Sequence, residues 1–168
     1  HSPAPGGGSV AALAGALGVS LASMVANLTI TKVFNERFSN LADQAQKLRD
    51  ELSRAVDADT DAFNEYMTAM RLPAKDEEQK AEKQKAIQNG LKNAVKVPLN
   101  TAICSFKAIE LAHSVAKDGL KGSVSDAGVG AQMAFSGLVG GVLNVLINLS
   151  DITDEDFIAD MRKQCQQL

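Results

Sequence analysis

Asp59 is the residue of this sequence whose position most suggests acid/base chemistry. Between Leu41 and Met70, apolar residues recur at helical spacing and charged residues lie mostly between them. At about 100° per residue, the position that should be apolar between Val56 and Phe63 is occupied by Asp59. A carboxylate in an apolar stripe loses hydration, so it is usually a satisfied structural residue or an acid/base catalyst. The helical pattern alone leaves both roles open.

The other residues with reactive side chains carry weaker signals. Asp57 and Asp61 point to roughly the opposite side of the same helix, where a solvated face explains them. His113 is the only internal histidine and has no second metal ligand nearby, which favours a place on a helix surface over a role as ligand. Cys104 and Cys165 lack CxxC spacing and are expected to be reduced structural thiols. The sequence predicts no metal centre.

A glycine-rich leader opens the first helix, within Pro3–Thr31, where no charge occurs before Lys32. Glycines at a helix N-terminus leave bare N–H groups where the macrodipole favours negative charge. A simple helix start and a ligand-binding loop are both compatible with this pattern. If the segment is a ligand-binding loop, the hydrogen-bond donors come from the residues at the start of the helix, which are Gly6, Gly7, Gly8 and Ser9.

Two uncharged helices with small-residue faces are expected to form the core. The first contains Val10–Leu28, whose nearly bare face is formed by Ala11, Gly15, Gly18, Ala22 and Ala26. The second is Ala127–Leu149, whose corresponding face is formed by Gly130, Ala134, Gly137, Gly141, Asn144 and Asn148. Such faces allow helices to approach closely, in soluble bundles as in membranes. The two amides either bridge helices or contact a ligand.

The remaining segments predict further helices and turns. A polar break covers 34–40, the helix that follows ends at Leu72-Pro73, and a charge-dense linker or exposed helix covers 74–85. Pro98 either kinks the next helix or opens a new one, and Gly119 ends it. A capping box at 123–126 starts the second uncharged helix, and Thr153 caps a final helix.

Composition supports this fold and excludes several classes of protein. Hydrophobic residues make up 45% of the sequence, much of it alanine, and aromatic residues only 4%. We therefore expect one all-α domain over 1–168, a multi-helix bundle around small-residue-rich central helices, in which His1-Ser2 resembles a tag remnant. A net charge of −3 argues against nucleic-acid binding. No secretory leader is visible, so a cytoplasmic protein without membrane partners is expected.

Four motifs, in order, carry a resemblance to a known family. They are PAPGGGSVAALAGALGVSLASMVANLT, VDADTDAF, VKVPL and SDAGVGA…NVLINLSDITDEDF. They resemble the cyclodeaminase domain of formiminotransferase-cyclodeaminase and its stand-alone relatives, which include methenyltetrahydrofolate cyclohydrolases. The sequence does not contain the formiminotransferase domain of the bifunctional enzyme, so a stand-alone enzyme or a fragment is expected, and the resemblance implies that longer relatives continue beyond residue 168.

The resemblance implies an all-helical homodimer or higher assembly that acts on a tetrahydrofolate derivative without a further cofactor. The second Asp of the VDAD motif, here Asp59, is regarded as catalytic in the family. The resemblance also suggests which other residues meet the substrate. Gly6, Gly7, Gly8 and Ser9 would offer donors, Asp126, Asn144 and Asn148 would contact the pterin, and Lys32 and Arg71 would contact the glutamate tail.

The sequence supports more than one function. The first is formiminotetrahydrofolate cyclodeaminase, with Asp59 as general acid/base. The second is methenyltetrahydrofolate cyclohydrolase, which would use the same carboxylate to activate water. A non-catalytic helical assembly module and a membrane hairpin made of the two uncharged helices are further alternatives.

Overall fold

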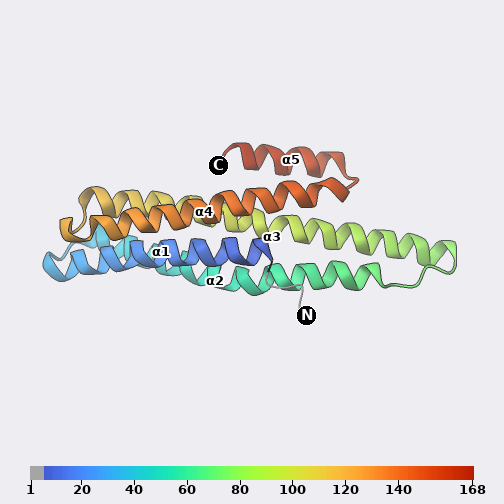
Figure 1. Ribbon diagram of the computed structural model, residues 1–168, viewed down its shortest axis with the longest axis horizontal. Helices are drawn as coiled ribbons and strands as arrows, with labels where there is room; N and C mark the ends of the chain where they lie inside the picture. Colours follow the sequence, from blue (N-terminus) through green and yellow to red (C-terminus); the bar gives the residue numbers. More distant parts are fainter. Residues whose placement is uncertain (1–5) are drawn as a thin grey trace.

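The computed structural model describes residues 6–168, so the Pro3–Pro5 part of the leader and the tag-like residues lie outside it. Four long helices form a bundle and a short fifth helix folds back over it (Figure 1). The described residues contain no strand, which confirms the predicted all-α class. The elements are α1 (Gly7–Lys32), α2 (Glu36–Met70), α3 (Glu77–Asp118), η1 (Lys121–Ser123), α4 (Val124–Asn148), η2 (Leu149–Asp151) and α5 (Glu155–Gln166).

The small-residue faces of α1 and α4 pack against each other, as predicted. A Cβ added to Gly18 would lie 2.6 Å from both the Ala134 nitrogen and the Gly130 carbonyl oxygen. On α4, a Cβ at Gly141 would lie 2.8 Å from the Pro98 carbonyl oxygen of α3. The backbones of these helices therefore approach too closely for any side chain at these glycines.

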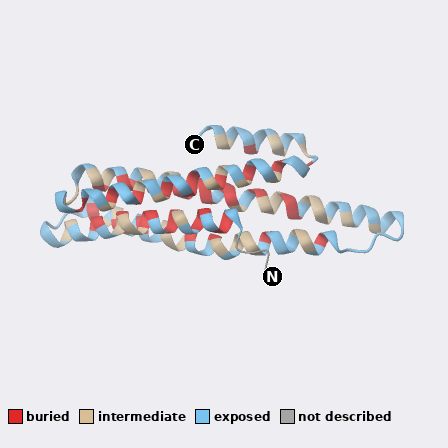
Figure 2. Cartoon of the chain, viewed as in Figure 1, coloured by how far each residue is buried: buried red, intermediate tan, exposed pale blue. Residues whose placement is uncertain are grey.

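The main core runs along the middle of the bundle. Its buried residues lie on the inward sides of the helices, which Figure 2 shows in red. Val19, Val25, Leu52 and Val115 are fully buried there, surrounded by alanines. The side chains are small because the helices are close, and this explains the low aromatic content.

The long helices differ in length, and this difference creates space at one end. The α2–α3 hairpin extends beyond the start of α1, while α5 runs back along α4 (Figure 1). A second apolar cluster fills the junction of α3, α4 and α5 and contains Leu91, Val95, Leu149 and Met161. Because α1 begins part of the way along its neighbours, the bundle is open beside its first turn.

Pro98 lies inside α3, and the helix continues through it. A proline has no N–H, so the carbonyl of Ala94 lacks its usual donor four residues later. The Asn148 Nδ2 donates to that carbonyl at 2.7 Å. The helix interruption is therefore compensated by an amide from α4, and Asn148 bridges two helices.

The predicted boundaries are confirmed in part. Asn35 caps α2 by accepting from the Arg37 N–H, so the polar break is shorter than expected. Of the two alternatives for 74–85, the exposed helix is confirmed for most of the run, because Asp76 caps α3. Ser123 is the N-cap residue of α4, as predicted, but its side chain makes no capping bond, so the predicted capping box does not form.

The first turn of α5 is held by Asp154, not by the predicted Thr153. Its carboxylate accepts from the Phe157 N–H at 3.1 Å and from Lys92 Nζ at 2.6 Å. The hydrogen bond from Lys92 lowers the pKa of Asp154 below its ordinary value of 3.8. A lowered folded pKa means that the contribution to stability is present above the unfolded value and lost as the pH falls through the folded one.

We therefore predict a pH-dependent effect of Asp154→Asn on stability. The Tm of the variant should lie below that of the wild type at neutral pH, and the difference should shrink as the pH falls below about 4. Thermal unfolding followed by circular dichroism measures this difference. Asp156→Asn, at an exposed position of the same turn, is the control. A Tm difference independent of pH would contradict the role given to the Lys92 contact.

Candidate functional site

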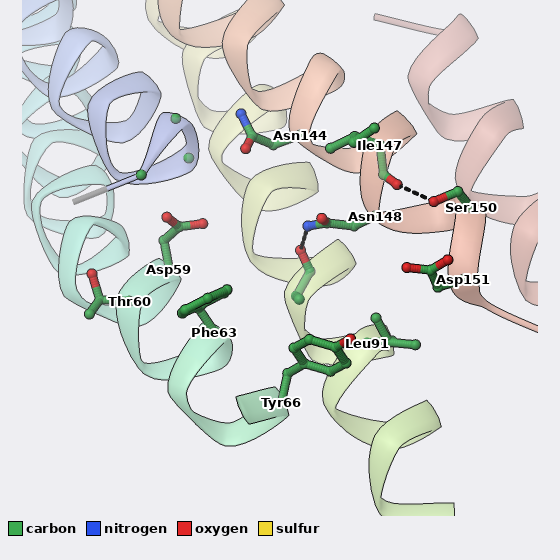
Figure 3. A pocket seen from close by; sticks show the side chains of 14 residues that line it. Asp59, Thr60, Phe63, Tyr66, Leu91, Asn144, Ile147, Asn148, Ser150 and Asp151 are labelled. Carbon is green, nitrogen blue, oxygen red and sulfur yellow. Dashed lines mark hydrogen bonds between the residues drawn. The ribbon is translucent and has the colours of Figure 1, made fainter. Parts of the chain in front are cut away.

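A cavity of about 410 Å³ lies beside the start of α1 (Figure 3). Its volume is within the range of small-molecule sites. Helices α1 to α4 and the turn η2 all contribute to its wall. The lining residues are Gly6, Gly7, Gly8, Asp59, Thr60, Phe63, Tyr66, Leu91, Ala94, Asn144, Ile147, Asn148, Ser150 and Asp151.

Asp59 caps the N-terminus of α1 from the neighbouring helix α2. Its Oδ2 accepts from the Ser9 backbone N–H at 2.8 Å and from the Ser9 Oγ at 2.9 Å. Gly6, the residue at the N-cap position, makes no side-chain cap bond. Asp59 therefore fills the place that an N-cap side chain would take, and the helix dipole suits an anion there. The anion site expected at the glycine-rich start of α1 is therefore occupied by the carboxylate of Asp59.

Ser9 does not face the cavity, which corrects the prediction that it contacts a ligand. It is 1% exposed, and its Oγ lies 3.0 Å from the Val56 carbonyl oxygen as well as 2.9 Å from Asp59 Oδ2. Both of its donors are therefore committed within the protein. The side chain of Ser9 positions Asp59, whose second oxygen, Oδ1, has no recorded hydrogen-bond donor among residues 6–168.

The carboxylate of Asp59 fills the space that a side chain at Gly8 would need. A Cβ at residue 8 would fall on Asp59 Oδ1, and a Cβ at Gly7 would lie 3.2 Å from the Asn144 Nδ2. The glycines thus leave room for the two polar side chains beside the first turn of α1. Gly6, Gly7 and Gly8 line the cavity, as expected, with backbone atoms only.

The two predicted asparagines of α4 both reach the cavity. Asn144 Nδ2 donates to the Gly140 carbonyl at 2.8 Å, within its own helix. Asn148 Nδ2 is used by the carbonyl that Pro98 leaves free, as described above. The Nδ2 of each asparagine thus uses one of its two N–H donors within the fold, and the second N–H and the amide oxygen remain to meet a ligand.

Two predicted ligand-binding residues, Lys32 and Asp126, lie away from the cavity, and their grouping with Asp59 is corrected. Lys32 ends α1, whereas the cavity lies at its start, roughly 37 Å away at about 1.5 Å per residue. Asp126 lies in the first turn of α4, at the end opposite to Asn144. Arg71 does not line the cavity. It caps the C-terminus of α2, five residues beyond Tyr66, and is exposed, so its contact with the glutamate tail stays a prediction.

The helical phase assigned to α2 is confirmed. Asp57 and Asp61 are exposed, whereas Asp59 is half-buried on the cavity wall. The sequence reasoning missed Phe63 and Tyr66, which follow Asp59 by four and seven residues and line the same cavity. This spacing places them on the face of Asp59, so the helical pattern contained the signal.

Neither cysteine shows features of a reactive thiol. Cys104 is buried and free, and burial raises its pKa to about 12. Burial also raises the pKa of Cys165. Residues 6–168 contain no group of three or more His, Cys, Asp or Glu side chains placed to hold a metal ion. His113 is exposed on α3, as predicted.

We predict that Ser9→Ala lowers turnover more than it weakens substrate binding. The variant keeps the backbone donor to Asp59 but loses the hydroxyl, so the carboxylate is less well fixed. A bond to a charged group of this kind contributes about 1.5–3 kcal/mol, or roughly 10–100-fold. Steady-state kinetics should show kcat reduced by about that factor with KM little changed. A rise in KM alone would indicate that Ser9 contacts the substrate.

Comparison with known proteins places the chain in a family. A family model described as formiminotransferase-cyclodeaminase matches residues 1–167. The methenyltetrahydrofolate cyclohydrolase of Methylorubrum extorquens is 36% identical, over 99% of this chain and 82% of that protein. The formimidoyltransferase-cyclodeaminase of Gallus gallus is 39% identical, over 100% of this chain and 32% of that protein.

A solved structure agrees with this assignment. The crystal structure of formiminotetrahydrofolate cyclodeaminase from Thermotoga maritima is similar at a TM-score of 0.86 and 28% identity. The match covers 99% of this chain and 81% of that chain. The chain spans about a third of the Gallus gallus relative and four fifths of the two bacterial proteins. This chain is an enzyme of the formiminotransferase-cyclodeaminase family.

Proposed function

We propose that this protein is a formiminotetrahydrofolate cyclodeaminase. It converts 5-formiminotetrahydrofolate to 5,10-methenyltetrahydrofolate and ammonia. The observation that carries the proposal is the carboxylate of Asp59, held through Oδ2 by Ser9 on the wall of a cavity of suitable size. The names of the relatives supply the substrate class.

The reaction needs orientation and proton transfer. The formimino group on N5 reacts in its protonated form, –CH=NH2⁺. N10 attacks its carbon, which gives a tetrahedral carbon bound to N5, to an NH2 group and to N10, which now carries the positive charge and the proton to be moved. The proton leaves N10, the amino nitrogen gains a proton, and the bond from the carbon to that nitrogen breaks. Ammonia departs and the 5,10-methenyl cation remains, so atoms and charge balance. Because the attack is intramolecular, the protein mainly holds the reactive conformation.

Asp59 serves both proton steps. Its Oδ1 accepts the proton from N10 and then returns it to the departing nitrogen. Oδ2 stays bonded to Ser9, which keeps the carboxylate in one orientation during both steps. The Asn144 and Asn148 oxygens and the backbone at Gly6, Gly7 and Gly8 line the same cavity and offer polar contacts to the substrate. The aromatic rings of Phe63 and Tyr66 offer flat surfaces for it.

A second candidate function is methenyltetrahydrofolate cyclohydrolase. It is favoured by the Methylorubrum extorquens relative, of which this chain covers 82%. In this reaction Asp59 takes a proton from water as it adds to the methenyl carbon. The bond from that carbon to N5 then breaks as N5 takes the proton held by Asp59 and the hydroxyl loses its own proton to solvent, which yields 10-formyltetrahydrofolate. Both reactions place the same carbon beside the same carboxylate.

A comparison of two substrates tests the proposal. The protein is incubated with 5-formiminotetrahydrofolate or with 5,10-methenyltetrahydrofolate, and the near-ultraviolet absorbance of the methenyl compound is followed. Formation of this absorbance from the first substrate, faster than in buffer, supports the cyclodeaminase. Loss of it from the second substrate without activity on the first supports the cyclohydrolase. No acceleration of either reaction would contradict both functions.

We also propose that the enzyme works as a homodimer in the cytoplasm. Helices α1 and α4 are long and apolar enough to span a membrane, and apolar side chains on their outer faces are exposed. Exposed fractions reach 55% for Phe135 and 60% for Leu143 of α4, and 50% for Leu13 and Leu17 of α1. Patches of this kind mark association surfaces. Sedimentation without detergent should show a dimer, whereas a monomer or an insoluble protein would contradict this assembly.

A further inference from the structure

Asp151 is an acidic residue of the cavity that the proposed chemistry does not use. It lies across the cavity from Asp59, with Phe63, Tyr66 and Leu91 along the wall between them (Figure 3). Its carboxylate has no hydrogen-bond donor or cation recorded within residues 6–168. Nearby Asp154, in contrast, is paired with Lys92. Asp151 is therefore a free acceptor at the far side of the site.

The backbone that carries Asp151 is firmly held. Gln88 of α3 donates from Nε2 to the Asp151 carbonyl at 3.0 Å, and its Oε1 accepts from the Thr153 N–H at 3.0 Å. Leu149 and Ile152, on either side of Asp151, are buried in the second apolar cluster. The turn η2 thus presents the carboxylate of Asp151 from a fixed position, which is what a recognition residue requires.

The negative charge of Asp151 determines which part of a folate it can bind. The 2-amino-4-oxo edge of a pterin carries two adjacent donors, the ring N3–H and the 2-amino group, which match the two oxygens of one carboxylate. The glutamate tail is anionic and would be repelled. The other polar side chains on the wall, apart from Asp59, are neutral. Asp151 is thus the lining side chain best suited to two adjacent donors.

We propose that Asp151 recognises the pterin edge of the substrate and so orients it in the cavity. This inference rests on the proposed function. With the pterin edge at Asp151, the reacting carbon faces Asp59 and the anionic tail points away from both carboxylates. Asp151 then decides specificity for 2-amino pterins and takes no part in proton transfer. A carboxylate that is merely solvated would not discriminate among pterins.

Binding measurements separate this role from catalysis. Calorimetry with 5-formyltetrahydrofolate, in which a formyl oxygen replaces the imino nitrogen, should give a Kd about 10–100-fold higher for Asp151→Ala than for the wild type. Asp156→Ala, the same change at an exposed acid outside the cavity, is the matched control and should bind normally. In turnover, Asp151→Ala should raise KM by a similar factor with kcat little changed.

A second ligand identifies the group that Asp151 contacts. An analogue with a methyl group in place of the 2-amino group should bind the wild type more weakly than 5-formyltetrahydrofolate, but should bind Asp151→Ala with no further loss. Equal losses in both proteins, or normal binding by Asp151→Ala, would overturn the assignment. A fall in kcat at unchanged KM would also overturn it, because it would make Asp151 catalytic.

The binding result stands apart from the proposed reaction. If the wild type binds 5-formyltetrahydrofolate but converts neither substrate, the proposed function fails and the comparison of the two ligands still tests Asp151. If the wild type binds no reduced pterin, both inferences are overturned. Unchanged circular dichroism and Tm are expected for Asp151→Ala, because the side chain is exposed and unpaired within residues 6–168.

Discussion

Asp59→Asn should abolish most of the turnover while leaving the fold intact. An amide at residue 59 can still accept from the Ser9 N–H and hydroxyl, so α1 keeps its cap. It cannot accept and return a proton. General acid/base catalysis typically contributes about 10²–10⁴-fold, and kcat should fall by that factor. Rates of methenyl formation from 5-formiminotetrahydrofolate measure the effect, with circular dichroism as the check on folding.

The matched control for this variant lies two residues along the same helix. Asp61→Asn makes the same chemical change at an exposed position that does not line the cavity, and it should keep normal activity. Asp57→Asn is a second control, also at an exposed position. If Asp59→Asn stayed active while Asp61→Asn did not, the helical phase and the role given to the carboxylate would both be wrong.

Gly18→Ala should be the most destabilising single-methyl change in the core. The added Cβ would lie 2.6 Å from backbone atoms of Gly130 and Ala134, so α1 and α4 would have to move apart. Overpacking typically costs about 1–3 kcal/mol. Because the clash is with backbone, we expect about 3 kcal/mol, which corresponds to a Tm lower by roughly 6–12 °C. Thermal and denaturant unfolding measure the change.

Gly128→Ala is the matched control for this prediction. Gly128 lies in α4, and a Cβ added there has no heavy atom within 4 Å. Alanine is favoured over glycine in helices by about 1 kcal/mol, so this variant should be equally or more stable than the wild type. A Tm for Gly18→Ala at or above that of the wild type would show that α1 and α4 are not in close contact at this point.

The sequence predicted the features that depend on local periodicity. The small-residue faces of α1 and α4 and the inward phase of Asp59 follow from helical geometry alone, and the structure confirms them. At Pro98 the sequence left open whether the helix continues or a new one begins. It continues, and the sequence could not decide this because the compensating amide comes from Asn148, fifty residues later in the chain. The hydrogen bond from Ser9 to Asp59 could not be predicted either, because it joins residues of two different helices.

The errors in the site came from choosing residues by charge without placing them along the helix axes. Lys32 and Gly7 occupy opposite ends of one helix, and helix length alone separates them by roughly 37 Å. The prediction for Asp126 is wrong for the same reason, because Asp126 lies in the first turn of α4 and Asn144 near its other end. Asp151 could not be found from the sequence, because its place on the cavity wall depends on how η2 folds against α3.

The site exists because helices of unequal length pack together. Helix α1 starts beside the middle of α2 and α3, which leaves its first turn exposed to a cavity and in need of an acceptor. Asp59 supplies that acceptor with one oxygen and leaves the other for the substrate. The residue that completes the fold at this point is therefore also the residue to which we assign proton transfer.

The most direct test is the simultaneous measurement of ammonia and methenyl product during reaction with 5-formiminotetrahydrofolate. We predict that the wild-type protein releases one ammonia for each 5,10-methenyltetrahydrofolate formed, faster than buffer does, and that Asp59→Asn loses this acceleration. Release of neither product above the rate in buffer, from folded protein that binds 5-formyltetrahydrofolate, would contradict the cyclodeaminase function.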